Sequence, residues 1–442
     1  MAAMDWAPRL KNWRRVGWQS PVEQPQSGVE FFSCFDMSLI RVSAQTGQDG
    51  ANGESVTPQN LTSAKHPTIC PDKQQLTIER VRCGIGHPRI SEHMKKFNVG
   101  VVGYGWVAGA HIDSINATDQ GQITAVCSSR KLDPAELSAR HGGEIQCHTS
   151  FKTMLSDPSI DVISVCSYPY QHTRQVIAAA EAGKHLIIEK PLTLNLKDLR
   201  AMQKAVAKAG VQTCVCFECR FSSQFLATKA VIDRGLLGQI HYGEVDYYHG
   251  IGPWYGQFRW NTKRNAGGSS LLSAGCHALD ALLLCMGDEV ESVSSYSTGS
   301  ANKDFKKYEY DTSSVTILKF KDGRVGKTAS IIDCIQPYYF HTHLVGSEGS
   351  LLDNKFHSNK LGGASGLDKN KWSELSMKMV DSGDVSDHPF QSQFEAFFAA
   401  LAKSKPMPLT DLATAAKSHE VIFAADLSAK KNRPVKLSEL RA

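Results

Sequence analysis

The sequence lacks the features that mark an exported or membrane-spanning chain. No run of residues approaches the roughly 18 consecutive apolar residues that cross a bilayer. The N-terminus also lacks the apolar core of a signal peptide. We therefore expect a cytoplasmic protein with no membrane partner.

An excess of charge of one sign is missing as well. The 442 residues contain 49 Lys and Arg against 44 Asp and Glu, which gives a net charge of only +5, and the basic residues form no dense run. Such a surface has little to attract a nucleic-acid backbone. We expect no nucleic-acid partner and a small-molecule ligand instead.

The cysteines do not form a pattern typical of disulfides or of a metal site. The chain has twelve, and with no export signal we expect reduced thiols. Cys214, Cys216 and Cys219 lie close together, which suggests a metal site as one interpretation. However, strand alternation places Cys214 and Cys216 on one face of a buried strand, and no second Cys or His group nearby completes a tetrahedral shell. We predict core residues and no metal.

Three segments of the chain differ in their residue patterns. Residues 1–93 contain many Gln, Ser, Pro and Gly without a helical or strand period, and we expect an extension that is disordered or not native to the functional protein, which would begin near Met94. Residues 94–217 alternate apolar strands with helices, which predicts βαβ units and a parallel sheet of the Rossmann type. Residues 218–442 predict an α+β domain whose open-faced sheet is mixed or antiparallel, with a hairpin at Asp322-Gly323.

A glycine-rich turn follows the first strand of the parallel sheet. Gly103-x-Gly105-x-x-Ala108 comes directly after FNVGVV and opens a helix at Trp106. The first glycine permits a tight turn, the second lets backbone approach a pyrophosphate, and the small third residue allows close helix packing. We predict a dinucleotide site here; the alternative is a glycine turn that binds nothing.

The end of the second strand indicates which dinucleotide is preferred. The acidic residue that grips an adenosine ribose is expected there, but the chain has Ser128, Ser129 and Arg130. Hydroxyls and a guanidinium suit a 2′-phosphate, so the sequence favours NADP over NAD. If Arg130 belongs only to a solvated loop, either cofactor is tolerated.

Further candidates stand where later strands end, the edge at which open α/β sheets bind ligands. Ser167, Tyr168 and His172 follow one strand and Glu189-Lys190-Pro191 follows the next. We predict that Ser167, Tyr168, His172, Glu189 and Lys190 contact the cofactor. Lys190 is also a candidate proton acceptor, which requires its ordinary pKa of about 10.4 to be lowered by burial and by a nearby positive charge. A surface Glu-Lys pair is the alternative.

The segment from Ala266 to Asp280 is the other candidate for chemistry. If it is helical, Ser273, His277 and Asp280 share one face. Polar residues on an otherwise apolar helix favour substrate binding, although packing or capping would also explain Asp280. Trp260 and Arg264, with Trp254 and Tyr255, precede this segment and could form aromatic and polar walls for a sugar, with core packing as the alternative for the tryptophans.

Taken in order, these motifs resemble the glucose-fructose oxidoreductase, inositol dehydrogenase and MocA (Gfo/Idh/MocA) family. The resemblance rests on GYGWVA, DVISVCSYPYQH, AGKHLIIEKPL, FECRF, the GG-to-HALD segment and HLVGSEGSLL, and covers Lys95 to about Leu437. It implies NAD(P)-dependent chemistry on a ring carbon of a sugar or cyclitol, and a homodimer or homotetramer. It also implies that Lys190 is the catalytic lysine and that His277 contacts substrate and relays its proton.

One departure from the family pattern bears on the mechanism. The usual D-x-G-x-H has an aspartate where this chain has Ser273, which does not ionise in the useful range. We therefore expect an NAD(P)-dependent dehydrogenase or reductase and keep two alternatives open. One is a glycosidase or lyase that uses transient oxidation by a bound dinucleotide, and the other is a non-catalytic NADP-binding regulator.

Overall fold

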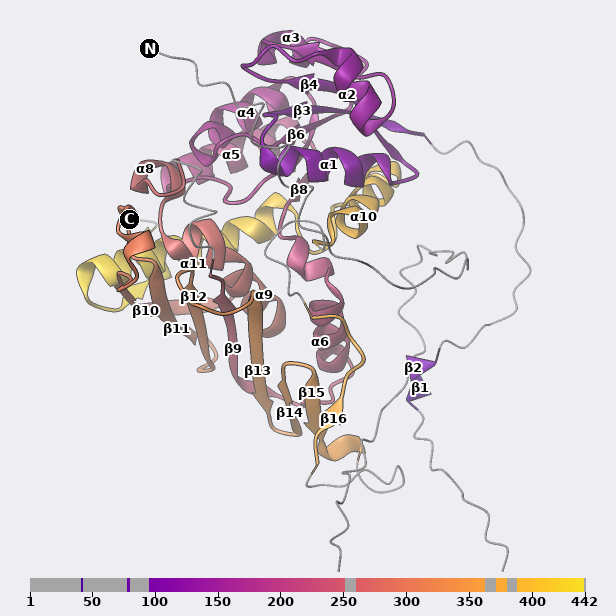
Figure 1. Cartoon of the computed structure of the whole chain (residues 1–442). Coiled ribbons are helices and arrows are strands. Elements are labelled where there is room, and N and C mark those ends of the chain that lie inside the picture. Colours follow the sequence, from indigo (N-terminus) through magenta and orange to yellow (C-terminus); the bar gives the residue numbers. More distant parts are fainter. Residues whose placement is uncertain are drawn as a thin grey trace, which may run out of the picture.

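Two domains with separate sheets make up the described part of the chain (Figure 1). The computed structural model describes residues 41–42, 78–79, 95–250, 260–361, 371–379 and 388–440. Most of the predicted extension at 1–93 lies outside the described residues. Within it, β1 (Arg41–Val42) pairs antiparallel with β2 (Ile78–Glu79).

The N-terminal domain is a six-stranded parallel sheet in the order β5-β4-β3-β6-β7-β8. The strand order reverses next to β3, which creates a topological switch point where ligands bind in folds of this kind. The strands are β3 (Phe97–Val102), β4 (Gly121–Cys127), β5 (Gln146–His148), β6 (Val162–Val165), β7 (His185–Ile188) and β8 (Thr213–Val215). The helices are α1 (Trp106–Asn116), α2 (Pro134–His141), α3 (Phe151–Leu155), α4 (Pro169–Glu181) and α5 (Leu196–Ala209).

Local sequence signals set the ends of several of these helices. Asp133 accepts a hydrogen bond from Ala135 N at the start of α2, and Asn195 does the same from Asp198 N at the start of α5. Gly210, at φ +67°, ends α5 in the left-handed conformation. Because all six strands pair in parallel, their carboxyl ends lie at the same edge of the sheet.

The C-terminal domain contains a nine-stranded mixed sheet, in the order β16-β15-β14-β13-β9-β12-β11-β10-β17. Only β9 and β12 pair in parallel among these described strands. The predicted hairpin joins β11 to β12 through Gly323, at φ +91°. The strands are β9 (Ile240–Tyr248), β10 (Val290–Thr298), β11 (Ser313–Phe320), β12 (Val325–Ile331), β13 (Tyr339–Gly346), β14 (Gly349–Leu352), β15 (Lys355–Ser358), β16 (Ser373–Glu374) and β17 (Val435–Lys436).

This sheet is covered by helices on one face only. Helices α9 (Cys276–Met286) and α11 (Leu412–Lys431) pack on β9, β10 and β12, and β11 alternates buried and exposed residues along its length. Tyr296, Val315 and Ile317 lie on the uncovered face with large exposed areas. The predicted fold class, a Rossmann domain with an open-faced α+β domain, is confirmed.

The segment before α9 departs from a regular α-helix. It is helical from Ser270 onward, as the candidate segment from Ala266 to Asp280 suggested, but Leu271–Gly275 forms a π-helical turn that leads into α9. Gly275 makes this possible, because a Cβ there would lie 2.3 Å from Ser330 Cβ of β12. The segment Arg264–Met286 also has the length and apolar composition of a membrane span, contrary to expectation, but its residues are mostly buried in the core of this fold.

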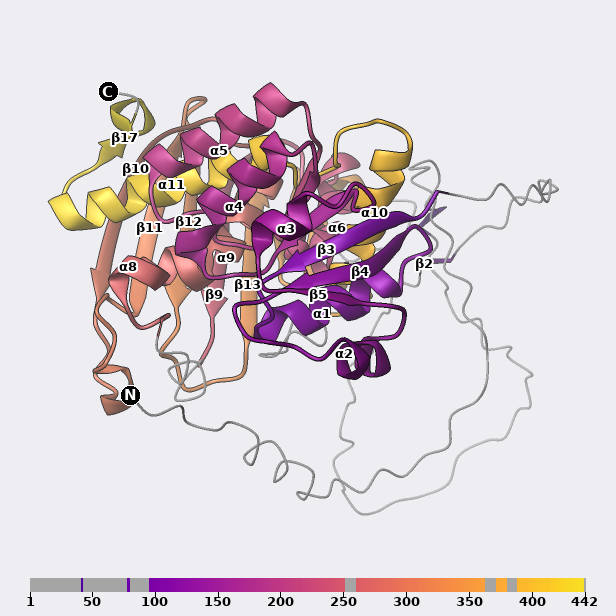
Figure 2. The same cartoon turned by 90° about the horizontal axis from the view of Figure 1, so that it is seen from above.

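The C-terminal helices connect the two domains (Figure 2). Helix α10 (Phe390–Ala402) packs on α1, and Phe398 stacks on Phe97 of β3 with ring centroids 5.9 Å apart. His419 of α11 accepts a hydrogen bond from Leu192 N, directly after the Lys190-Pro191 pair. Residues far apart in the sequence therefore meet beside the edge of the parallel sheet.

Candidate active site

The glycine turn has the shape that a pyrophosphate requires. Gly103 has φ +91°, and a Cβ on it would lie 2.7 Å from backbone atoms of Ser167. Gly105 is the N-cap of α1, and a Cβ on it would meet nothing within 4 Å. No side chain caps this helix, so its first amides can bind an anion. Ala108 is fully buried against the sheet, whereas Trp106 is 45% exposed beside the turn.

The residues after β4 lie next to this turn. Ser128 is buried, and its Oγ accepts a hydrogen bond from Arg130 N at 3.1 Å. Arg130 Nη2 donates to Tyr104 O at 2.6 Å, which fixes the exposed guanidinium group beside the turn. Ser129 is exposed. This segment contains no carboxylate that would repel a 2′-phosphate.

The residues after β6 have two different environments. Ser167 forms the wall of the glycine turn, and its Oγ donates to Gln175 Oε1 at 2.5 Å. Tyr168 is 46% exposed. His172 is buried, with Nδ1 2.9 Å from Pro191 O and Nε2 3.0 Å from Ser167 O, and burial lowers its pKa. Through these contacts His172 links the ends of β6 and β7.

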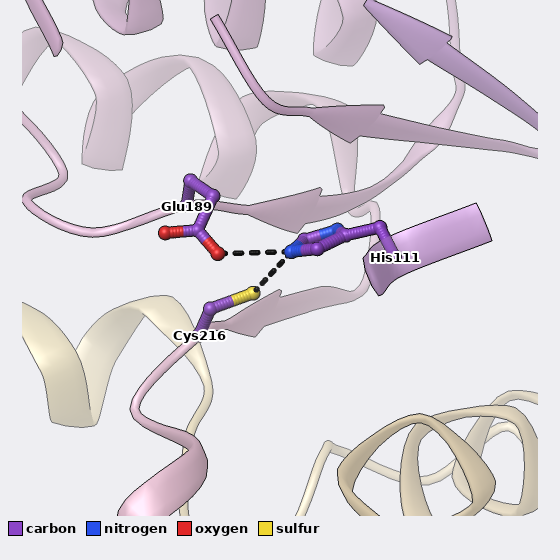
Figure 3. Close-up of side chains that lie close together, drawn as sticks. All are labelled: His111, Glu189 and Cys216. Atoms are coloured by element: carbon purple, nitrogen blue, oxygen red, sulfur yellow. Dashed lines mark hydrogen bonds and ion pairs between the residues drawn. The ribbon is translucent and has the colours of Figure 1, made fainter. Parts of the chain in front are cut away.

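Glu189 is held by a buried histidine (Figure 3). His111 of α1 places Nε2 2.9 Å from Glu189 Oε1 and Nδ1 2.8 Å from Ser164 Oγ, and Cys216 Sγ lies 3.8 Å from Nε2. Burial acts to raise the pKa of Glu189, but the hydrogen bond and charge of His111, together with the charges of Lys190 and His172, outweigh it and the pKa is lowered. Glu189 Oε2 accepts from Lys190 N at 3.0 Å. Glu189 therefore orients the backbone that carries Lys190.

Lys190 lies where the two domains meet, close to His277 and Glu218. His277 is buried on α9, and burial together with the positive charge of Lys190 lowers its pKa well below the usual value. Glu218 lies in a short 3₁₀ turn, Glu218–Phe221, that follows β8. The distance between His277 Nε2 and Glu218 Oε1 is 3.7 Å. A lysine, a histidine and a carboxyl group therefore gather at the sheet edge.

The polar side-chain atoms of Ser273 and Asp280 are hydrogen-bonded to residues other than Lys190, His277 and Glu218. Ser273 Oγ donates to Ser269 O at 2.9 Å within the π-helical turn. Both carboxylate oxygens of Asp280 accept hydrogen bonds from Arg220, at 2.6 and 2.8 Å, and Ser418 Oγ donates to Oδ1 at 2.6 Å. These contacts support the packing alternative for Asp280.

The aromatic and basic residues before the π-helical turn also differ in placement. Trp260 lies 5.6 Å from Tyr168, measured between ring centroids, and Tyr168 stacks on Tyr170. Arg264 is exposed, and its Nη2 donates to Glu309 O at 2.9 Å. Trp260 therefore joins an aromatic group beside α4, whereas Arg264 is bonded to a loop of the C-terminal domain. The candidates Trp254 and Tyr255 lie outside the described residues.

Three residues of this site were not singled out by the sequence reasoning: His111, Glu218 and His388. The imidazole Nδ1 of His388 lies 3.6 Å from Glu218 Oε1. Glu218 carried a usable signal, because it follows β8 at the same sheet edge as Lys190 after β7. His111 and His388 reach the site only through the packing of α1 and α10, which local patterns do not predict.

Comparison with known proteins agrees with this architecture. Residues 97–217 match the oxidoreductase family with an NAD-binding Rossmann fold (GFO_IDH_MocA), and residues 225–352 match the GFO/IDH/MocA C-terminal domain. A myo-inositol 2-dehydrogenase of Thermotoga maritima is 27% identical over 254 residues, which cover 58% of this chain and 74% of that protein. A scyllo-inositol 2-dehydrogenase (NAD(+)) of Bacillus subtilis is 25% identical over 349 residues, which cover 77% of this chain and 96% of that protein.

Solved structures share the fold. Scyllo-inositol dehydrogenase from Lactobacillus casei, with bound NAD(H) and scyllo-inositol, superimposes with a TM-score of 0.64 at 19% identity, over 78% of this chain and 100% of that one. The two family matches together span more than half of the sequence, in the order that the motifs indicated. The chain belongs to the Gfo/Idh/MocA family of NAD(P)-dependent oxidoreductases.

Proposed function

We propose that this chain oxidises or reduces a ring carbon of a sugar, a sugar derivative or a cyclitol, with Lys190 and His277 in proton transfer. The carrying observation is that Lys190, held at the end of β7 by Glu189, and His277, 3.7 Å from Glu218 Oε1, come from different domains and meet at this site. The charge of Lys190 contributes to the lowered pKa of His277. They lie at the edge of the parallel sheet where the glycine turn ends β3. The inositol dehydrogenases among the relatives support this class of substrate.

The chain's own residues have separable roles in this proposal. A bound dinucleotide would supply the hydride acceptor or donor through its nicotinamide C4. Lys190, as a free amine, takes the proton of the reacting hydroxyl, and His277 holds the same oxygen and relays the proton. Glu189 fixes the main chain of Lys190. Trp260 and Tyr168 provide an aromatic wall of the kind that packs against sugar rings. Ser273 and Arg264 remain proposed substrate contacts, and Asp280 a positioning residue.

NADP is the proposed preferred cofactor. Gly103, Gly105, Trp106 and Ala108 would hold the pyrophosphate, while Ser128, Ser129 and Arg130 would meet the adenosine ribose. The hydrogen bond from Arg130 to Tyr104 supports this assignment, because it holds a guanidinium group beside the turn. Ser167, Tyr168, His172 and Glu189 would shape the nicotinamide end.

We also propose a homodimer or homotetramer that works in the cytoplasm. The uncovered face of the large sheet carries exposed Tyr296, Val315 and Ile317, which a second copy would cover. The nine cysteines in the described part of the chain are all free, as suits a reducing compartment. Light scattering of the purified protein at several concentrations would measure the oligomeric state.

A substrate screen tests the proposed function. Sugars and cyclitols are incubated with the full-length enzyme and either NAD or NADP, while nicotinamide absorbance and products are followed. Reduced cofactor that accumulates with an oxidised ring product supports the dehydrogenase. Product without net cofactor change would support the glycosidase or lyase instead. Cofactor binding without any redox change across the panel would support the regulator.

A further inference from the structure

The carboxyl group of Glu218 is buried next to the proposed proton-transfer residues and is only partly satisfied. Glu218 is 1% exposed, and its Oε2 has no hydrogen-bond partner within the described structure. The other oxygen, Oε1, lies 3.7 Å from His277 Nε2 and 3.6 Å from His388 Nδ1. Burying a carboxyl group without full hydrogen bonding lowers stability. Its presence here therefore indicates a functional role.

The turn that carries Glu218 is fixed to α9 by a buried ion pair. Two residues further along, Arg220 forms a buried, bidentate ion pair with Asp280 of α9, one turn beyond His277. This pair holds the 3₁₀ turn against α9, so that Glu218 lies beside His277. Ser273, on the preceding turn, has its hydroxyl bonded to the backbone and carries no ionisable group.

We propose that Glu218 supplies the carboxyl group that Ser273 does not, and accepts through His277 the proton that Lys190 takes from the substrate. This inference rests on the proposed function. Glu218 acts through His277, so we describe it as a relay and positioning residue rather than as one that contacts substrate.

The relay balances in the direction of oxidation. The substrate O–H bond breaks and its proton forms an N–H bond on Lys190, while the carbon loses a hydride to the dinucleotide. Lys190 passes the proton to His277 Nδ1, a buried atom with no hydrogen-bond partner among the described residues. His277 Nε2 gives its own proton to the Glu218 carboxylate. Lys190 is again a free amine, His277 stays neutral, and Glu218 becomes a neutral acid that later loses its proton to solvent.

The charges around Glu218 suit this role. Burial and the negative charge of Glu189 raise the pKa of Glu218 to about 8, although Lys190 and His111 oppose the shift. A group with a pKa near neutral can both accept and return a proton. The other titratable groups near it are the imidazoles of His277 and His388 and four thiols. Burial raises the pKa of all four thiols well above neutral, so they stay protonated: Cys214, Cys216, Cys219 and Cys276.

The test compares Glu218→Gln, Glu218→Asp and the exposed control Glu289→Gln in the full chain, with a substrate from the screen. For the parent, kcat/KM for oxidation should rise with pH about a midpoint near 8, because only the carboxylate accepts a proton. Glu218→Gln should lose about 10²-fold in kcat and lack this midpoint. Glu218→Asp should recover part of the rate and the midpoint, and Glu289→Gln should match the parent. A Glu218→Gln variant with the parent's rate and pH profile would overturn the inference.

A second measurement needs no substrate. The pKa of Glu218 is raised on folding from 4.5 to about 8, so the folded state binds its proton more tightly. Protonation of Glu218 therefore stabilises the folded state fully below pH 4.5, and this stabilisation is lost as the pH rises towards 8. Glu218→Gln should gain stability relative to the parent over this window, by urea unfolding. A difference that does not change with pH would contradict the inference.

These outcomes separate the inference from the proposed function. If Lys190→Ala keeps the parent's turnover, the proton-transfer role that the proposed function gives to Lys190 fails. If Lys190→Ala loses turnover while Glu218→Gln keeps both the rate and the pH profile, only the role of Glu218 fails.

Discussion

Arg220 and Asp280 form a buried, bidentate ion pair, with Nε 2.6 Å from Oδ2 and Nη2 2.8 Å from Oδ1. The pair joins the 3₁₀ turn after β8 to α9, and Ser418 Oγ connects it to α11. Both partners are nearly fully buried. The geometry of Glu218 and His277 depends on this pair, because it ties together the two elements that carry them.

Asp280→Ala should therefore destabilise the protein strongly. Loss of one partner leaves the Arg220 guanidinium buried and unpaired, which costs about 3–5 kcal/mol. Urea unfolding should show this loss. The control is Asp288→Ala, whose pair with Lys417 is largely exposed and should be worth less than about 1 kcal/mol. Equal losses in the two variants would show that the buried pair does not hold the 3₁₀ turn against α9.

The two glycines of the turn should respond differently to alanine. Gly105→Ala meets no protein atom within 4 Å, and its backbone suits any residue, so the free energy of unfolding should hardly change. Its methyl group would occupy the space proposed for the pyrophosphate, so dinucleotide affinity should fall by roughly tenfold or more. Gly103→Ala combines φ +91° with a 2.7 Å clash and should lower both stability and affinity. Calorimetric titration with NAD and NADP measures the affinity, and parent-like affinity in Gly105→Ala would place the pyrophosphate elsewhere.

Arg130→Ala should reduce the preference for NADP. A charge-assisted hydrogen bond is worth about 1.5–3 kcal/mol, so the KM for NADP should rise roughly 10- to 100-fold while the KM for NAD changes little. Lys131→Ala, next to it and also exposed, is the matched control. Equal effects on the two cofactors would remove Arg130 from 2′-phosphate recognition.

Lys190→Ala should abolish most turnover. Loss of the group that accepts the hydroxyl proton should lower kcat by about 10²- to 10⁴-fold. Lys197→Ala, an exposed lysine of the same domain, should keep the parent's rate. If Lys190→Ala turned over its substrate within about tenfold of the parent, another residue would have to be the proton acceptor.

Local patterns predicted the parts of the site that lie within one strand and its following turn. Gly103 and Lys190 are of this kind, because neighbouring residues in the sequence determine the backbone conformation at the end of a strand. Asp280 is not, because its partner Arg220 is 60 residues away and Ser418 is 138 residues away. The sequence predicted a regular helix through Ser273, whereas close contact of Gly275 with Ser330 of β12 accompanies a π-helical turn, a tertiary effect that helical periodicity does not contain.

Hydride transfer from substrate to cofactor is the central claim, and isotope transfer tests it most directly. The enzyme is incubated with NAD(P)⁺ and a substrate from the screen that carries deuterium on every ring carbon, and the recovered cofactor is analysed by mass spectrometry and NMR. The account predicts one deuterium at the nicotinamide C4 for each oxidised product, and a large loss of this transfer in Lys190→Ala. If reduced cofactor accumulated together with product but carried no deuterium, the account would be contradicted.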